Sequence, residues 1–211
     1  MKAIGVTQFL EKSFDVFDIG DEWLNSFGEI EKNFKMSVTG DSGHGKTELV
    51  VKFIKELCLK NRIKADYFSY EQGHSKSLQD AILRNKMDEV KGKVMFMTGG
   101  TFDELFTRLK RRASAKIVVV DSQDYSELTT KQYKLLVKTF PRKSFIVTSW
   151  ANKEKPANKA ARDIEFMSDV KIYVNNYKAH PRSRYGGNKT FVIWDKKDSK
   201  PVQQTLFQDG D

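Results

Sequence analysis

The chain has 211 residues, of which 39% are hydrophobic and 12% aromatic, so its composition excludes a disordered chain and allows one domain with a substantial core. No apolar run approaches the roughly 18 residues of a membrane span, and the start MKAIGVTQFLEKSFD lacks the continuous apolar stretch of a signal peptide. We therefore expect a cytoplasmic protein with no membrane partner. The 37 basic and 28 acidic residues give a formal net charge of +9, so DNA or RNA is a candidate partner. Because the lysines are spread along the chain, charge alone is equally compatible with an ordinary basic protein.

Short β-rich runs alternate with amphipathic segments along the chain. In chain order the pattern predicts strand 34–39, helix 46–60, strand 65–70, helix 75–87, strand 93–97, helix 102–113, strand 116–122, helix 129–140, strand 144–150, helix 156–167, strand 170–176 and strand 190–196. Such alternation predicts an α/β fold with a mainly parallel sheet, helices on both faces and right-handed crossovers. We expect one domain, 1–211, with its core at about 20–196 and a polar tail at 197–211.

Several residues define the predicted elements more closely. The helix 46–60 carries apolar side chains at helical spacing, and its cysteine, Cys58, is expected to be a buried residue rather than a reactive thiol. Ser75 and Thr101 are expected to cap the N-termini of their helices, and Pro156 to lie in the first turn of the helix 156–167. The last two strands are expected to pair as an antiparallel edge hairpin, with Gly186 and the glycine after it in their connection.

The sequence GDSGHGKTEL at 40–49 matches G-x-x-x-x-G-K-[ST], a loop that cradles the phosphates of a nucleotide. Its backbone N–H groups and the start of the following helix would form an anion site. Lys46 would reach the β- and γ-phosphates, and the hydroxyl of Thr47 would bind Mg²⁺. The residues expected to contact the nucleotide here are Gly40, Asp41, Ser42, Gly43, His44, Gly45, Lys46, Thr47 and Glu48.

Two carboxylates follow predicted strand ends. Asp121 comes directly after the apolar run 117–120, in the position of the Walker-B acid that meets the Mg²⁺ shell, so Thr47 and Asp121 are the expected metal residues. Glu71 follows the strand 65–70 and could orient or deprotonate an attacking water. Position alone leaves a surface loop glutamate equally possible at Glu71.

The order of these parts resembles the RecA-like ATPases, especially the RadA/KaiC/DnaB branch, over roughly residues 20–195. The stretch FSYEQGHSKSLQDAILR resembles that family's strand, catalytic glutamate and following helix. The resemblance implies that Glu71 is the catalytic carboxylate and that ATP with Mg²⁺ is the ligand. Many AAA-type ATPases place the glutamate beside the Walker-B acid, where this chain has Ser122, and that difference supports the RecA-like assignment.

The same resemblance implies further site residues. The strand 144–150 would lie between the Walker-B strand and the glycine-loop strand, with Thr148 and Ser149 as sensors of the γ-phosphate. A basic finger from a late hairpin would reach the nucleotide of the next subunit, with Arg184 slightly preferred over Arg182 and with Lys178 as a third candidate. Strand-end polarity and a solvated basic loop are the ordinary alternatives. A finger acting in trans implies an oligomer, either a hexameric ring or a filament.

Three functions remain compatible with the sequence. The first is an ATPase acting on single-stranded DNA in recombination, replication or repair, similar to compact phage-encoded RecA-like proteins; its DNA would lie on the loops 123–128 and 151–159, with Trp150 as the nearest stacking residue. The second is a KaiC-like regulatory or assembly ATPase without nucleic acid. The third, a small-molecule kinase, is disfavoured because Glu71 and a basic finger suit hydrolysis between subunits.

Overall fold

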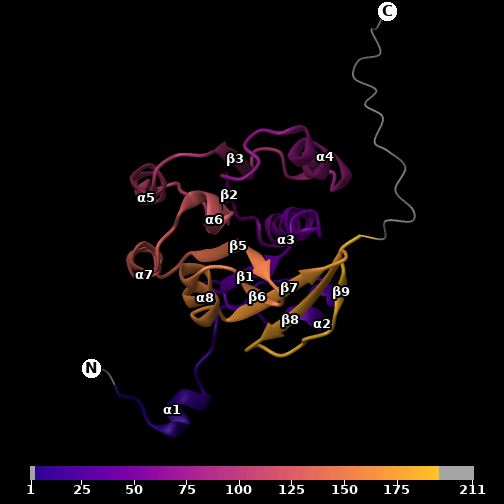
Figure 1. Ribbon diagram of the computed structural model, residues 1–211. Helices are drawn as coiled ribbons and strands as arrows, with labels where there is room; N and C mark the ends of the chain where they lie inside the picture. The colour runs from indigo at the N-terminus through magenta and orange to yellow at the C-terminus, as the bar shows by residue number, and fades with distance from the viewer. Residues whose placement is uncertain (1–2, 195–211) are drawn as a thin grey trace, which may run out of the picture.

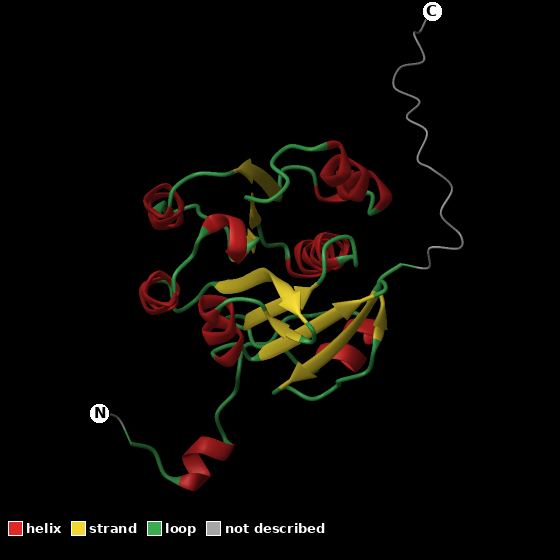
Figure 2. Ribbon diagram, viewed as in Figure 1, coloured by secondary structure: helices red, strands yellow, loops and turns green. Residues whose placement is uncertain are grey.

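A computed structural model describes residues 3–194 of the chain, and Figures 1 and 2 show their arrangement. The strands are β1 (Lys35–Gly40), β2 (Ala65–Ser69), β3 (Val94–Thr98), β4 (Ile117–Asp121), β5 (Ser144–Asn152), β6 (Lys155–Pro156), β7 (Val170–Asn175), β8 (Lys178–Ser183) and β9 (Phe191–Val192). The helices are α1 (Val6–Leu10), α2 (Asp21–Phe27), α3 (Lys46–Asn61), α4 (Lys76–Arg84), the 3₁₀ helix η1 (Met87–Val90), α5 (Phe102–Lys110), α6 (Gln123–Ser126), α7 (Thr130–Thr139) and α8 (Lys159–Phe166).

The strands form one sheet in the order β3-β2-β4-β5-β1-β7-β8-β9, and β6 pairs with β5. All neighbours from β3 to β7 are parallel, which confirms the predicted α/β fold. As expected, β5 lies between β4 and β1. Because parallel strands end at the same edge of a sheet, the residues that follow β1, β2, β4 and β5 meet at one edge.

Each face of the sheet has its own hydrophobic core. On one face α3 packs against β1, β2, β4 and β7, and on the other α5, α7 and α8 cover β4 and β5 (Figure 1). The helix α3 buries Leu49, Phe53, Ile54 and Leu57 on the side that its spacing predicted, and full burial of each such side chain stabilises by about 1.5–3 kcal/mol. Cys58 is also buried there, and burial raises its thiol pKa to about 11, so it is an inert core residue.

The C-terminal edge corrects one sequence prediction. The segment 178–183, which the sequence predicted as connection, is strand β8, and it pairs antiparallel with β7 on one side and with β9 on the other. The edge is antiparallel as expected, but the hairpin is β7–β8 rather than β7 with 190–196. Gly186 and its neighbour lie between β8 and β9. Residues 195–196, and the tail predicted at 197–211, lie outside the described residues.

The start of α8 corrects a second prediction. Pro156 is not in the first helical turn; it lies in β6, opposite Ala151 of β5. The helix begins after Asn158, whose side chain accepts a hydrogen bond from the Ala161 N–H at 2.9 Å. Asn is a stronger helix-starting residue than the proline two positions earlier, because its side chain satisfies an exposed backbone N–H group. The expected caps Ser75 and Thr101 are both present.

Short helices before β1 were not predicted. The helix α2 contributes Trp23 and Phe27 to the core, whereas α1 has no buried residue and stands away from the sheet in Figure 1. Within residues 3–194 none of the helices combines the length and apolarity that crossing a membrane requires.

Candidate functional site

The glycine loop connects the end of β1 to the start of α3, and its two motif glycines are required by close contacts. Gly45 has φ +102°, and a Cβ there would lie 2.9 Å from a ring carbon of Tyr177. A Cβ on Gly40 would lie 2.4 Å from the carbonyl oxygen of Val174. The first and last glycines of the motif are therefore fixed by the neighbouring β7 and by the turn after it.

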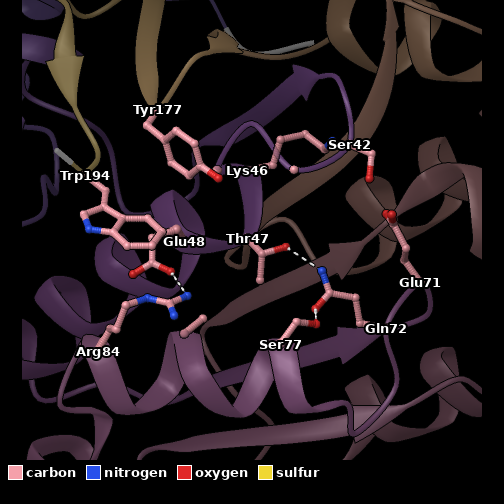
Figure 3. Close-up of a pocket in the computed structure, with 13 residues that line it drawn as sticks. Ser42, Lys46, Thr47, Glu48, Glu71, Gln72, Ser77, Arg84, Tyr177 and Trp194 are labelled. Carbon is pink, nitrogen blue, oxygen red and sulfur yellow. Dashed lines mark hydrogen bonds and ion pairs between the residues drawn. The ribbon is translucent and has the colours of Figure 1, made fainter. Parts of the chain in front are cut away.

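A cavity of about 190 Å³ opens over this loop (Figure 3). Its walls come from the glycine loop and α3, from the end of β2 with α4, and from two aromatic residues near the C-terminal edge. The lining residues are Ser42, Gly43, Gly45, Lys46, Thr47, Glu48, Glu71, Gln72, Ser77, Ala81, Arg84, Tyr177 and Trp194. Most of the predicted loop residues thus face one cavity, together with the predicted catalytic glutamate.

Lys46 places a positive charge at the base of the loop. Its Nζ donates to the carbonyl oxygens of Gly40 at 2.8 Å and Asp41 at 3.0 Å. Burial lowers the pKa of this ammonium, and the carboxylates of Glu71 and Asp121 act in the opposite direction. Asp41 therefore contributes its backbone carbonyl here, and His44 likewise uses its carbonyl, which accepts the N–H of Tyr177 at 3.1 Å.

Asp121 lies at the end of β4 and is held by three hydroxyl groups. Its Oδ1 accepts from Thr148 at 2.5 Å, and its Oδ2 accepts from Thr47 at 3.1 Å and from the phenol of Tyr67. Tyr67 is fully buried, and burial followed by the charge of Asp121 raises its pKa well above the usual value. Its phenol therefore stays protonated and remains a donor.

The pair Thr47 and Asp121 fits a Mg²⁺ ion. Hydroxyl and carboxylate oxygens are the hard ligands that Mg²⁺ prefers, and this ion usually takes only one or two protein ligands beside phosphate oxygens and waters. Within residues 3–194 no three His, Cys, Asp or Glu side chains gather closely enough to hold a metal by themselves. Bound there, Mg²⁺ would neutralise phosphate charge, with Thr47 and Asp121 as its protein residues.

Glu71 lies two residues after the end of β2, beside Asp121. Its backbone N–H donates to the Asp121 carbonyl at 3.2 Å, and its carboxylate faces the cavity across from Tyr177 and Trp194 (Figure 3). Burial and the charge of Asp121 raise its pKa, while Lys46 and side-chain hydrogen bonding from Trp150 oppose this rise. A half-buried carboxylate with a raised pKa beside a nucleotide loop is placed to accept a proton from water.

Gln72 and Ser77 continue the wall beside Glu71. The amide of Gln72 donates to Thr47 Oγ1 at 3.5 Å and accepts from Ser77 Oγ at 2.8 Å (Figure 3). The start of α4 is therefore linked to the predicted metal residue Thr47.

Three other predicted site residues, Glu48, Thr148 and Ser149, have different partners in the structure. The carboxylate of Glu48 is ion-paired with Arg84 at 2.9 Å, at the side of the cavity. Thr148 reaches Asp121, whereas Ser149 points to the opposite face of the sheet and its hydroxyl pairs with Thr39 at 3.0 Å. Alternation of side chains along β5 separates these neighbours, so only Thr148 belongs to the network around Asp121.

The candidate finger residues do not line the cavity of their own chain in the described part of the structure. Lys178 and Arg182 lie on the exposed side of β8, where Arg182 shares a surface groove with Lys171 and His180. Arg184 follows β8; its side chain is 66% exposed and lies 3.3 Å from Asp169. These cations are therefore at the surface of the C-terminal edge.

The sequence reasoning missed an aromatic wall. Tyr177 and Trp194 meet edge-to-face with ring centroids 5.3 Å apart, and the guanidinium of Arg84 lies 4.7 Å from the centre of the Trp194 ring. These residues are far from the glycine loop in sequence, so no local pattern marks them. Tyr67 was missed for the same reason, because its hydroxyl meets Asp121 only when β2 and β4 pair.

No family model matches the sequence, and no curated protein is similar enough in sequence to serve as a relative. Among solved structures, a crystal structure of a KaiC-like protein from the hyperthermophilic archaeon Pyrococcus horikoshii OT3 superposes with a TM-score of 0.56. The two sequences are 17% identical, and the match covers 86% of this chain and 98% of that one. At this identity the similarity shows a shared fold, and it confirms the RecA-like α/β architecture.

Proposed function

We propose that the protein is a Mg²⁺-dependent ATP hydrolase of the RecA-like kind that works as an oligomer on single-stranded DNA. The main observation in favour of hydrolysis is that Lys46, Thr47 and Glu71 line one cavity, and that Asp121 lies behind it, hydrogen-bonded to Thr47. A nucleotide-binding protein without hydrolysis would not need Glu71 across from the phosphate loop.

Each residue has a distinct part in the proposed reaction. The loop N–H groups and Lys46 bind the phosphates, and the charge of Lys46 stabilises negative charge that develops on the γ-phosphate. Glu71 orients the attacking water and accepts its proton. The Tyr177–Trp194 wall offers aromatic area against which the base of the nucleotide packs.

The positive charge of the protein supports DNA as its partner. The net charge is +9, and the segment from the end of β5 to the start of α8 presents Lys153, Lys155 and Lys159 at the surface. The second candidate is a regulatory or assembly ATPase without nucleic acid, favoured by the structural similarity to a KaiC-like protein. A small-molecule kinase fits less well, because it has no need of Glu71 as a base for water.

The variant Glu71→Gln tests whether the protein hydrolyses ATP with Glu71 as the base. The amide keeps the shape of the side chain but cannot take a proton, so turnover should fall about 10²-fold or more, while ATP binding measured with a fluorescent analogue stays within a few-fold. Glu165→Gln is the matched control, since burial also raises the pKa of Glu165, which lies outside the cavity. Wild-type turnover in Glu71→Gln would contradict the assignment.

The test of the partner is ATP turnover with and without oligo-dT across a salt series. Stimulation that fades with salt is expected, because Lys–phosphate contacts release counterions. Turnover with no oligo-dT binding even at low salt would instead favour the regulatory ATPase.

A further inference from the structure

The aromatic wall of the nucleotide cavity includes a residue that lies outside the paired strands. Trp194 is two residues beyond the end of β9. Tyr177 meets its ring edge-to-face with centroids 5.3 Å apart, and the guanidinium of Arg84 lies 4.7 Å from the centre of the same ring. The contact with Arg84 therefore connects the C-terminal edge of the sheet to α4, on another wall of the cavity.

Arg84 is the last residue of α4, and an ion pair anchors it to α3. Its Nη2 donates to Glu48 Oε2 at 2.9 Å, and the side-chain amide of Asn85 donates to the other oxygen of that carboxylate at 2.6 Å. The side chain of Glu48 is only 10% exposed, so it needs these donors in place of water. The cation beside Trp194 is thus held by Glu48, which directly follows the predicted metal residue Thr47.

The guanidinium of Arg84 leaves one of its donors unused. Its Nε is buried and has no hydrogen-bond acceptor within residues 3–194. A buried N–H without an acceptor is destabilising, so stability alone does not favour this placement. What the placement provides is contact between the planar cation and the indole ring of Trp194, in addition to the ion pair with Glu48.

The cavity has two ends with different chemistry. Figure 3 shows Glu71 and Trp194 on opposite sides of it, with Thr47 between them. In the proposed function the phosphates lie over Lys46 and Thr47, with the γ-phosphate toward Glu71. The base of the nucleotide then points toward Trp194. Because Arg84 lies at this end, opposite Glu71, it is placed to affect binding of the base rather than the attack of water.

We infer that Arg84 is a positioning residue for the base of the nucleotide: paired with Glu48, it holds the ring of Trp194 at the cavity, and that ring packs on the base. The inference rests on the proposed binding of ATP in this cavity. It makes Arg84 and Trp194 one unit that acts on the base and not on the phosphates. Binding of inorganic tripolyphosphate, which has phosphates but no base, should therefore not depend on this unit.

The experiment compares the Kd of ATP with that of tripolyphosphate, both with Mg²⁺, by calorimetry in a Glu71→Gln background that does not consume ATP. Arg84→Lys keeps a charge beside Glu48, but a lysine ammonium paired with that carboxylate cannot also lie flat on the ring. It should raise the Kd of ATP about fivefold and leave that of tripolyphosphate unchanged. Trp194→Ala should raise the Kd of ATP about tenfold. The double variant should bind ATP no more weakly than Trp194→Ala, because the two residues act as one unit.

Arg108→Lys is the matched control. Arg108 also pairs with a buried carboxylate, that of Asp66, but lies outside the lining of this cavity, so both Kd values should stay at those of the background. Equal weakening of ATP and tripolyphosphate by Arg84→Lys would overturn the inference, and so would losses that add in the double variant. Background protein that binds ATP no more tightly than tripolyphosphate would overturn it and leave the hydrolase standing. Wild-type protein that binds ATP without hydrolysing it would overturn the proposed function itself.

Discussion

Asp121 is the residue on which the site depends most. Both of its carboxylate oxygens accept hydrogen bonds, and the three donors come from α3, β2 and β5. Buried carboxylates need such partners, because an unpaired one loses its hydration without compensation. The network therefore fixes the direction in which Asp121 faces Thr47, and so the geometry available to Mg²⁺.

Tyr67→Phe should weaken this arrangement. The variant removes one hydroxyl from Asp121 and leaves the ring packing intact. Groups that orient a metal ligand typically contribute about 10–100-fold to metal affinity. The Mg²⁺ concentration that half-saturates nucleotide binding should therefore rise about tenfold. Titrating Mg²⁺ against a fluorescent ATP analogue measures this, and affinity without Mg²⁺ should change little.

Tyr133→Phe is the control for this prediction. Tyr133 is equally buried but lies in the core on the other face of the sheet, away from Asp121. If both variants shift the Mg²⁺ midpoint alike, the effect of Tyr67 is general loosening of the core and not positioning of Asp121.

At the scale of elements, β8 shows how pairing overrides local preference. Its sequence KAHPRS contains a proline and three basic residues and lacks the β-branched residues that mark strands. It is a strand because it pairs along its whole length with β7, and Ala179 and Pro181 are buried. Pro181 is tolerated because β9 pairs only with Lys178 and Ala179, so the missing N–H leaves no broken ladder on that side.

Asn158→Ala should destabilise more than the loss of an ordinary helix cap. The variant loses the cap of α8 and also the bonds to Gln123 and Asp124 that join three elements. A cap alone contributes about 1 kcal/mol, and two further bonds at about 0.5–1.5 kcal/mol each add to it. Urea unfolding at equilibrium measures the total.

Thr129→Ala provides the comparison, because its side chain caps α7 within a local capping box. Equal losses in free energy of unfolding for the two variants would mean that the bonds of Asn158 to Gln123 and Asp124 add nothing to stability.

At the scale of the whole molecule, the C-terminal edge presents cations away from the chain's own cavity. In the ion pair of Arg184 with Asp169 the Arg184 side chain is exposed, and surface pairs of this kind contribute little to stability, so this guanidinium is available to another subunit. This placement supports the proposal that Arg184 completes the site of a neighbour.

Mixing variants tests that proposal. Arg184→Ala and Glu71→Gln should each have low turnover, and mixed oligomers should regain activity, because some interfaces then combine an intact Glu71 with an intact Arg184. Steady-state turnover at several mixing ratios measures the recovery. A mixture of Lys46→Ala with Glu71→Gln should stay inactive, since both residues line the cavity of one chain. Inactive Arg184 mixtures that still assemble would exclude Arg184 as the finger.

Much of the fold followed from the sequence. The strands β1 to β5 and the helix α3 were predicted within a few residues, because their apolar patterns are strong. All of them except the edge strand β3 are mostly buried in the sheet or against it. The local motif also marked the glycine loop, and the topology of parallel strands explained why Glu71, Asp121 and Thr148 share an edge. The predictions for Pro156 and for the segment that forms β8 were wrong. Pairing with another strand, rather than the local sequence, set the conformation at both places.

The sequence by itself determined the phosphate loop and its lysine, because a glycine pattern and the turn it permits are local properties of the chain. The tertiary structure decided the rest of the site. Only strand pairing placed Tyr67 and Thr148 on Asp121 and turned Ser149 to the other face. Only the packing of the C-terminal edge brought Tyr177 and Trp194 to the cavity. Contacts between residues far apart in sequence leave no local signal, because they depend on which surfaces the fold buries together.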